Sequence, residues 1–234
     1  MMFGSRILAI CASLALVVSS CGRPLTPNER AFAATITGDA LNINRVRLVR
    51  GAPVAAVTFR RQARPRVTCR ARILPPPRSE IVTAKPAAVA LFNRVFFTRD
   101  WYIDDFLRRY PDTLILTDAM LLAHELTHVW QWQHRKLTGY SPLRAAAEHG
   151  TSDDPYLFDL NTSPRFLDFG FEQQGTIVEE YVCCRALAPH AERTKRLHRM
   201  LAEVMPVRPL PKDGKRERDV LLPWKDAEVD GICD

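Results

Sequence analysis

The stretch Leu121–His134, with the sequence LLAHELTHVWQWQH, constrains this chain more than any other. On an α-helix, residues four apart project within about 40° of each other and one turn apart. His124 and His128 can therefore direct two imidazole nitrogens at one metal ion, and Glu125 can reach a water at that metal. The spacing predicts a metal-binding helix with Glu125 as the general base.

A helical wheel divides this stretch into an apolar face and a polar face. The apolar face consists of Leu122, Ala123, Leu126, Val129 and Trp130, and the polar face of His124, Glu125, His128, Gln131 and Trp132. A helix that is anchored by one face and carries ligands on the other makes a rigid site. Thr117 or Asp118 is expected to cap its start. Two alternatives stay open: histidines that merely lie on a helix surface, and a site that keeps the motif without activity.

The segment Met1–Cys21 has the pattern of an export signal. Arg6 precedes an apolar run that is too short to span a bilayer as a permanent helix. The run ends in Val-Ser-Ser-Cys, which resembles the lipobox of bacterial lipoproteins, so Cys21 is expected to carry lipid. Because no aspartate follows Cys21, we expect the periplasmic face of the outer membrane. The alternative is an ordinary signal cleaved near Ser20, which would release a soluble secreted protein.

Export into an oxidising compartment also accounts for the cysteines outside the signal. These are Cys69, Cys183, Cys184 and Cys233. They allow two disulfides in three connectivities. A bond between the adjacent Cys183 and Cys184 is the least favourable, so we expect one of them to pair with Cys69 and the other with Cys233. A zinc site made of these cysteines is the alternative, but no Cys-x-x-Cys spacing supports it.

The front of the chain, residues 22–79, is rich in arginine. It contains twelve arginines and no lysine, against only two acidic side chains, Glu29 and Asp39. Three runs in this part have strand patterns and predict a small antiparallel sheet with one cationic face. The runs are Leu41–Val49, Val54–Arg60 and Val67–Ile73. The cationic face is expected either to meet anionic lipids or acidic polymers of the envelope or simply to be solvated, and no nucleic-acid-binding motif is present.

Three further elements are expected around the histidine helix. Ala87–Thr98 has a strand pattern and is a candidate edge for binding an extended peptide, although buried sheet is the commoner meaning of such a run. Asp100–Arg109 is expected to be a short helix. Phe171–Ala188, FEQQGTIVEEYVCCRALA, has a helical pattern with Glu172 and Glu179 on one stripe.

Two histidines leave a catalytic zinc one protein ligand short. A carboxylate on a second helix can complete the set, and Glu172 is our first choice and Glu179 our second. The carboxylate that does not bind the metal is expected to orient an imidazole N–H. The alternative is that both are solvated helix charges.

LLAHELTHVWQ followed by EQQGTIVEEY resembles the uncharacterised bacterial metallopeptidase domains whose core reads HELTH-x-x-Q. More broadly, it is similar to zincin peptidases with a glutamate as third ligand. The resemblance covers about residues 87–188 and implies zinc at His124, His128 and Glu172 with Glu125 as general base. It supplies no substrate. The chain departs from the best-studied glutamate zincins in having Thr176, instead of an aspartate, four residues after Glu172.

We therefore expect an α+β, zincin-like single domain, in which a small antiparallel sheet packs on the active-site helix and a second ligand-bearing helix. Its segments are a signal at 1–21, the arginine-rich part at 22–79, the metallopeptidase core at 80–200 and a Pro/Lys-rich tail at 201–234. The expected activity is zinc-dependent hydrolysis of peptide bonds in protein. The alternatives are cleavage of peptidoglycan peptides and a non-catalytic lipoprotein that binds or scaffolds.

An oxyanion formed during hydrolysis would need a further hydrogen-bond donor. The candidates are Tyr181, Tyr156, Tyr140, His149 and His134.

Overall fold

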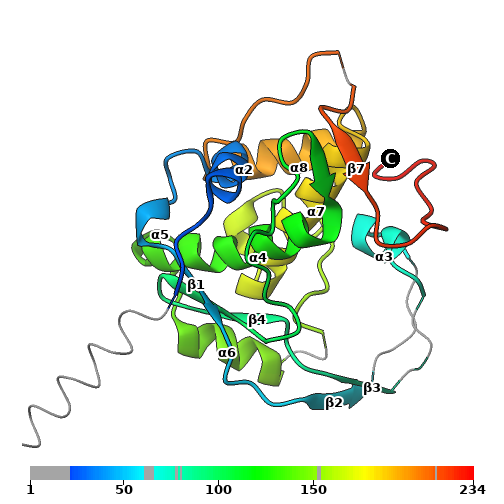
Figure 1. Cartoon of the computed structure of the whole chain (residues 1–234). Coiled ribbons are helices and arrows are strands. Elements are labelled where there is room, and N and C mark those ends of the chain that lie inside the picture. Colours follow the sequence, from blue (N-terminus) through cyan, green and yellow to red (C-terminus); the bar gives the residue numbers. More distant parts are fainter. Residues whose placement is uncertain (1–21, 61–65, 77–78, 80, 152–153, 214) are drawn as a thin grey trace, which may run out of the picture.

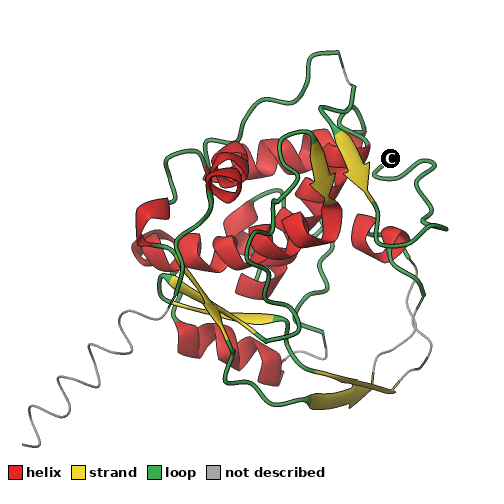
Figure 2. Ribbon diagram, in the orientation of Figure 1, coloured by secondary structure: helices red, strands yellow, loops and turns green. Residues whose placement is uncertain are grey.

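A computed structural model describes residues 22–60, 66–76, 79, 81–151, 154–213 and 215–234. This part of the chain is a mixed α+β fold in which helices predominate (Figures 1 and 2). Its helices are α2 (Pro27–Thr37), η1 (Ile43–Arg45), α3 (Cys69–Ile73), α4 (Leu116–Gln133), α5 (Arg135–Thr138), α6 (Pro142–Thr151), η2 (Phe166–Asp168), α7 (Phe171–Leu187) and α8 (Glu192–Ala202).

The strands form three small sheets. They are β1 (Arg47–Arg50), β2 (Val57–Arg60), β3 (Ile81–Ala84), β4 (Ala88–Leu91), β5 (Arg94–Phe97), β6 (Thr113–Ile115) and β7 (Asp219–Leu221). The largest sheet has the order β1-β5-β4, and the other two pair β2 with β3 and β6 with β7.

The two longest helices, α4 and α7, pack against each other at the centre of the molecule (Figure 1). The predicted apolar face of α4 is buried, with Leu122, Val129 and Trp130 fully inaccessible. Strands β4 and β5 lie against α4, and α8 packs on α7. One buried cluster runs from Leu25 to Cys233, so the front, the middle and the tail of the chain share a core.

The expectation of an antiparallel sheet made of the three front runs is wrong for the described residues, because none of these runs pairs with another. β4 and β5 are antiparallel, but β1 lies parallel to β5, with Leu48 opposite Val95. β1 therefore pairs with a strand from residues 80–200 instead of with its neighbour β2, which pairs with β3. Alternation along a short strand predicts which side chains are buried, but it does not select the partner strand.

The predicted strand Val67–Ile73 is wrong, because residues 69–73 form the short helix α3. Thr68 caps this helix by accepting a hydrogen bond from the Ala71 amide. Cys69 bonds to Cys183 in α7. A helical cap and a covalent tether outweigh the period-two alternation of so few residues.

Two neighbouring predictions also need correction. The run Ala87–Thr98 is a hairpin, because the chain turns back at Phe92, which has a φ of 58°. Residues 100–109 form turns and no helix. There, the buried Glu29 carboxylate accepts a hydrogen bond from the Phe106 amide, and the Asp105 carboxylate accepts one from the Leu107 amide. Hydrogen bonds from backbone amides to side chains compete with those of a helix.

Helix α2 is missing from the predictions, although the sequence carries its start signal. Thr26 and Glu29 form a capping box, and Pro27 occupies the first helical position. Glu29 is fully buried and pairs with Arg23. A Thr-x-x-Glu pattern with proline after the threonine is a known mark of a helix start.

The expected disulfide pattern is confirmed. Cys69 pairs with Cys183, and Cys184 pairs with Cys233. The two bonds fix α3 and the C-terminal tail to consecutive residues of α7. The lipidation candidate Cys21 lies outside the described residues. Within them, no helix is long and apolar enough to cross a bilayer.

Candidate metal centre

Three side chains from two helices converge on one point. His124 and His128 come from α4 and Glu172 from the first turn of α7. The Nε2 atoms of the two histidines lie 3.1 Å apart, and Glu172 Oε2 lies 3.3 Å from the first and 3.4 Å from the second. Ligands at about 2.0–2.1 Å from a tetrahedral zinc are themselves about 3.3–3.4 Å apart. The three atoms therefore fit three corners of a zinc site, and all three residues are buried.

Four of the five residues on the predicted polar face of α4 are buried, and α7 packs against α4. The fifth, Trp132, is half-buried and contacts the Phe92 ring. Gly175 lies where the two helices meet, and it was not predicted as a site residue. A Cβ atom at this position would lie 2.7 Å from Cε1 and 2.8 Å from Nε2 of His124. The His124 ring therefore occupies space that any other residue at position 175 would fill. The available signal was a glycine inside a helical pattern, which often marks a close approach.

We expect Gly175→Ala to weaken zinc binding about 10- to 100-fold, the range for changes that disturb ligand orientation. Helix propensity alone predicts that Gly175→Ala stabilises the fold, because alanine is favoured over glycine by about 1 kcal/mol in a helix. Zinc release to a chelator measures the effect. Gly150→Ala in α6 is the control, since a Cβ there meets nothing within 4 Å. Wild-type zinc retention in Gly175→Ala would contradict this role.

The outward nitrogens of both histidines face side chains that can fix their orientation. His128 Nδ1 lies 2.8 Å from Gln131 Oε1, and the Gln131 amide in turn donates to Gln174 Oε1. His124 Nδ1 lies 3.3 Å from Glu179 Oε1, at ion-pair distance, but it has no hydrogen-bond partner among the described residues. Glu179 thus lies behind His124, away from the three converging atoms.

Charges around the centre are complementary to a cation. Burial lowers the pKa of His124, but hydrogen bonds and charges from Glu172 and Glu179 outweigh it and raise that pKa to about 10. Burial raises the pKa of Glu172, but His128 and His124 bring it well below its usual value. Imidazole and carboxylate ligands bind a metal in their deprotonated form, so a metal ion at this centre would release any proton that the histidines carry.

Glu125 differs from the other carboxylates of the site in its surroundings. It is only 6% exposed, and its Oε2 atom has no hydrogen-bond partner among the described residues. Burial raises its pKa, and the charges of both histidines only partly offset this. A buried carboxylate oxygen without a partner costs free energy of folding, which is a mark of a functional group.

The rim of the centre is formed by α6 and the loop after it. His149 Nε2 lies 3.2 Å from Glu172 Oε1, and its side chain is 44% exposed. Tyr156 is also exposed, with its ring centre 6.1 Å from that of His124. Tyr140 is buried and stacks on His128 at 6.1 Å. His149 and Tyr156 thus combine proximity to the site with access to solvent.

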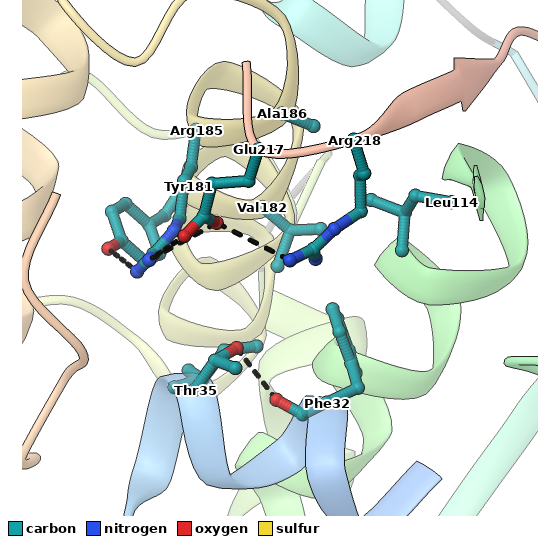
Figure 3. A pocket seen from close by; sticks show the side chains of 10 residues that line it. Phe32, Thr35, Leu114, Tyr181, Val182, Arg185, Ala186, Glu217 and Arg218 are labelled. Carbon is teal, nitrogen blue, oxygen red and sulfur yellow. Dashed lines mark hydrogen bonds and ion pairs between the residues drawn. The ribbon is translucent and has the colours of Figure 1, made fainter. Parts of the chain in front are cut away.

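Tyr181 is not at the metal centre, which corrects its place as the first candidate oxyanion donor. Its hydroxyl lies 2.9 Å from His198 Nδ1 and accepts a hydrogen bond from Arg185. Figure 3 shows it beside a small cavity of about 30 Å³ that α2 and Leu114 also line. Residue 181 lies two positions past Glu179 and so projects from a different side of α7. His134, another of the candidate oxyanion donors, has its Nδ1 atom 3.0 Å from the carbonyl oxygen of Trp130.

No protein-family model matches the chain, and no curated protein sequence matches it. Among solved structures, the effector domain of Pseudomonas aeruginosa VgrG2b is similar to this chain at 21% identity. The TM-score is 0.49, and the match covers 86% of this chain and 99% of that one. Similarity at this level assigns neither a fold family nor a function.

Proposed function

We propose that this protein is a zinc-dependent metallopeptidase. The observation that carries the proposal is the unpartnered Oε2 of the buried Glu125, one residue from His124 in a cage of three converging ligand atoms. A purely structural metal site has no use for such a carboxylate, and structural zinc usually has four protein ligands. Two histidines and one glutamate leave the fourth position open.

His124, His128 and Glu172 would hold the ion. When bound, zinc would act as a Lewis acid that activates water and polarises the scissile carbonyl. Glu125 then takes a proton, and its raised pKa makes it a better base than an exposed glutamate. It can pass that proton to the leaving amine. His149 and Tyr156 lie at the exposed rim, where one of them can donate a hydrogen bond to the oxyanion.

Strand β4 supports a peptide as substrate. It packs against α4, and β5 is its only strand partner in the described part of the chain. Its other edge can pair with an extended peptide by β-addition, which uses main-chain hydrogen bonds and accepts many sequences. The free edge of β4 (Ala88–Leu91) is thus the proposed binding edge for an extended substrate beside α4.

Purified full-length protein in detergent tests the proposal. We expect about one zinc per chain and hydrolysis of an unstructured protein that stops with a chelator and returns with zinc. His124→Ala/His128→Ala is the negative control and should lose both. Zinc-bound protein that cleaves peptidoglycan fragments but no protein would favour the cell-wall alternative. Zinc without any hydrolysis would favour the binding or scaffolding alternative, and absence of zinc would refute the proposal.

We also propose that Cys21 carries lipid and holds the protein at the bacterial membrane, on the basis of its Val-Ser-Ser-Cys sequence. Several acyl chains bind a bilayer far more firmly than one. Wild-type protein should therefore fractionate with membranes and incorporate labelled fatty acid, whereas Cys21→Ser should incorporate none. Equal labelling of the two proteins would exclude this residue as the anchor. Residual binding of the Cys21→Ser protein to anionic vesicles would instead measure the attraction of the arginine-rich residues 22–79 to anionic lipid.

A further inference from the structure

Helix α3 brings an arginine to the back of the metal centre. Arg70 Nη1 donates to both carboxylate oxygens of Glu179, at 2.8 Å and 3.2 Å. Glu179 is 4% exposed, whereas the Arg70 side chain is 54% exposed and covers it from the solvent side. Glu179 Oε1 also lies 3.3 Å from His124 Nδ1, which is an ion-pair distance without the geometry of a hydrogen bond. A chain of charged contacts thus runs from Arg70 through Glu179 to His124.

The position of Arg70 depends on a disulfide. Helix α3 has only five residues, too few to be stable alone. Its first residue, Cys69, is bonded to Cys183 of α7, one turn beyond Glu179. The Cys69 amide also donates to Glu180 Oε2 at 2.8 Å. The disulfide therefore holds residue 70 next to the carboxylate that it contacts.

We propose that Arg70 is a positioning residue of the metal centre, and that the Cys69–Cys183 disulfide makes its complete assembly depend on oxidation. This inference rests on the metal site of the proposed function. Arg70 fixes the Glu179 carboxylate, which fixes the ring of His124. In the reduced chain, α3 loses its covalent tether, Arg70 leaves Glu179, and His124 is no longer held from behind.

The redox step is ordinary thiol–disulfide exchange. The two thiols lose two electrons and two protons as the S–S bond forms, and a disulfide-bearing oxidant of the export compartment accepts them and becomes a dithiol. A reducing cytoplasm lacks that oxidant. The chain would therefore hold zinc less tightly where it is made than after export.

Zinc release to excess chelator from the purified, zinc-loaded full chain tests the role of Arg70 without any assay of activity. We expect Arg70→Ala to release zinc about 10- to 100-fold faster, as for other residues that orient a ligand through a second group. Arg70→Lys keeps the charge and should recover part of the loss. Arg70→Ala added to Glu179→Gln should have little further effect, because both changes break the same chain of contacts.

Arg23→Ala is the matched control. Arg23 pairs with Glu29, another buried carboxylate, at 2.7 Å, and Glu29 accepts hydrogen bonds from the Thr26 and Phe106 amides and from no histidine. We expect zinc release close to that of the wild type. The absorption spectrum of the cobalt-loaded protein should shift in Arg70→Ala and not in Arg23→Ala, since it reports ligand geometry. Release and spectrum unchanged in Arg70→Ala, with wild type holding zinc, would overturn the inference and leave the proposed function intact.

The disulfide is tested with Cys69→Ser/Cys183→Ser, with circular dichroism as the check on folding. Zinc release as fast as in Arg70→Ala is expected. A folded cysteine variant that holds zinc like the wild type would overturn the dependence on oxidation. If that variant does not fold, zinc-loaded wild type and Cys184→Ser/Cys233→Ser are both treated with a phosphine reductant, which is not a dithiol chelator, and zinc loss that precedes loss of helical signal in both is the expected result. Zinc loss only together with unfolding would overturn it.

Discussion

Glu125→Gln should retain zinc at the wild-type level and lose about 10²- to 10⁴-fold of its hydrolytic rate, the usual contribution of a positioned general base. The amide has the same size as the carboxylate but cannot take a proton. Because Glu125 Oε2 has no partner among the described residues, its replacement breaks no hydrogen bond of that atom. We also expect Glu125→Gln to unfold at the same temperature as the wild type or a higher one, since a buried unpaired charge is removed.

Glu180→Gln is the matched control for this change. Glu180 is as buried as Glu125, but its carboxylate is paired with Arg193. We expect the control to lower the unfolding temperature, because a buried ion pair loses one partner, and to leave the rate per bound zinc near the wild-type value. Opposite effects on stability and activity in the two variants separate a catalytic carboxylate from a structural one. Wild-type hydrolysis in Glu125→Gln would remove Glu125 from the mechanism.

The two central helices were predictable because their signals are local and long. α7 begins at the predicted Phe171, and α4 contains the whole histidine motif. A helical period sustained over four or more turns survives in most tertiary contexts. The start of α4 was less accurate: Thr117 and Asp118 lie inside the helix, which begins at Leu116 without a side-chain cap.

The arginine-rich front was predicted less well because long-range contacts determine it. The Val67–Ile73 segment is helical where it is tied to α7 across 114 residues of sequence. Its Arg70 reaches a glutamate that no local pattern connects with it. Gly175 is similar: its helix was predicted, but the need for glycine arises only from the His124 ring of another helix. Sequence periodicity indicates which face of a helix is buried, and it does not indicate which atoms lie opposite that face.

The carboxylates of α7 provide the sharpest test of the ligand set. Glu172, Glu179 and Glu180 are all buried, but only Glu172 has an oxygen within 3.4 Å of the Nε2 atoms of both histidines. We therefore expect Glu172→Ala to lose zinc and activity together, because a site with three protein ligands is reduced to two. Its zinc affinity should fall well beyond the about 10- to 100-fold loss expected when an outer partner is removed.

Alanine variants of Glu179 and Glu180 provide the zinc affinities with which that of Glu172→Ala is compared. Glu179→Ala removes the carboxylate behind His124 and should weaken zinc binding about 10- to 100-fold while leaving three ligands in place. Glu180→Ala should destabilise the fold through loss of the Arg193 pair, with little effect on zinc affinity in the folded protein. Zinc titrations at low temperature, with circular dichroism on each variant, give the order of the three. If Glu179→Ala abolishes binding while Glu172→Ala keeps it, the third ligand lies two turns further along α7, and His124 would have to present Nδ1 instead of Nε2 to the metal.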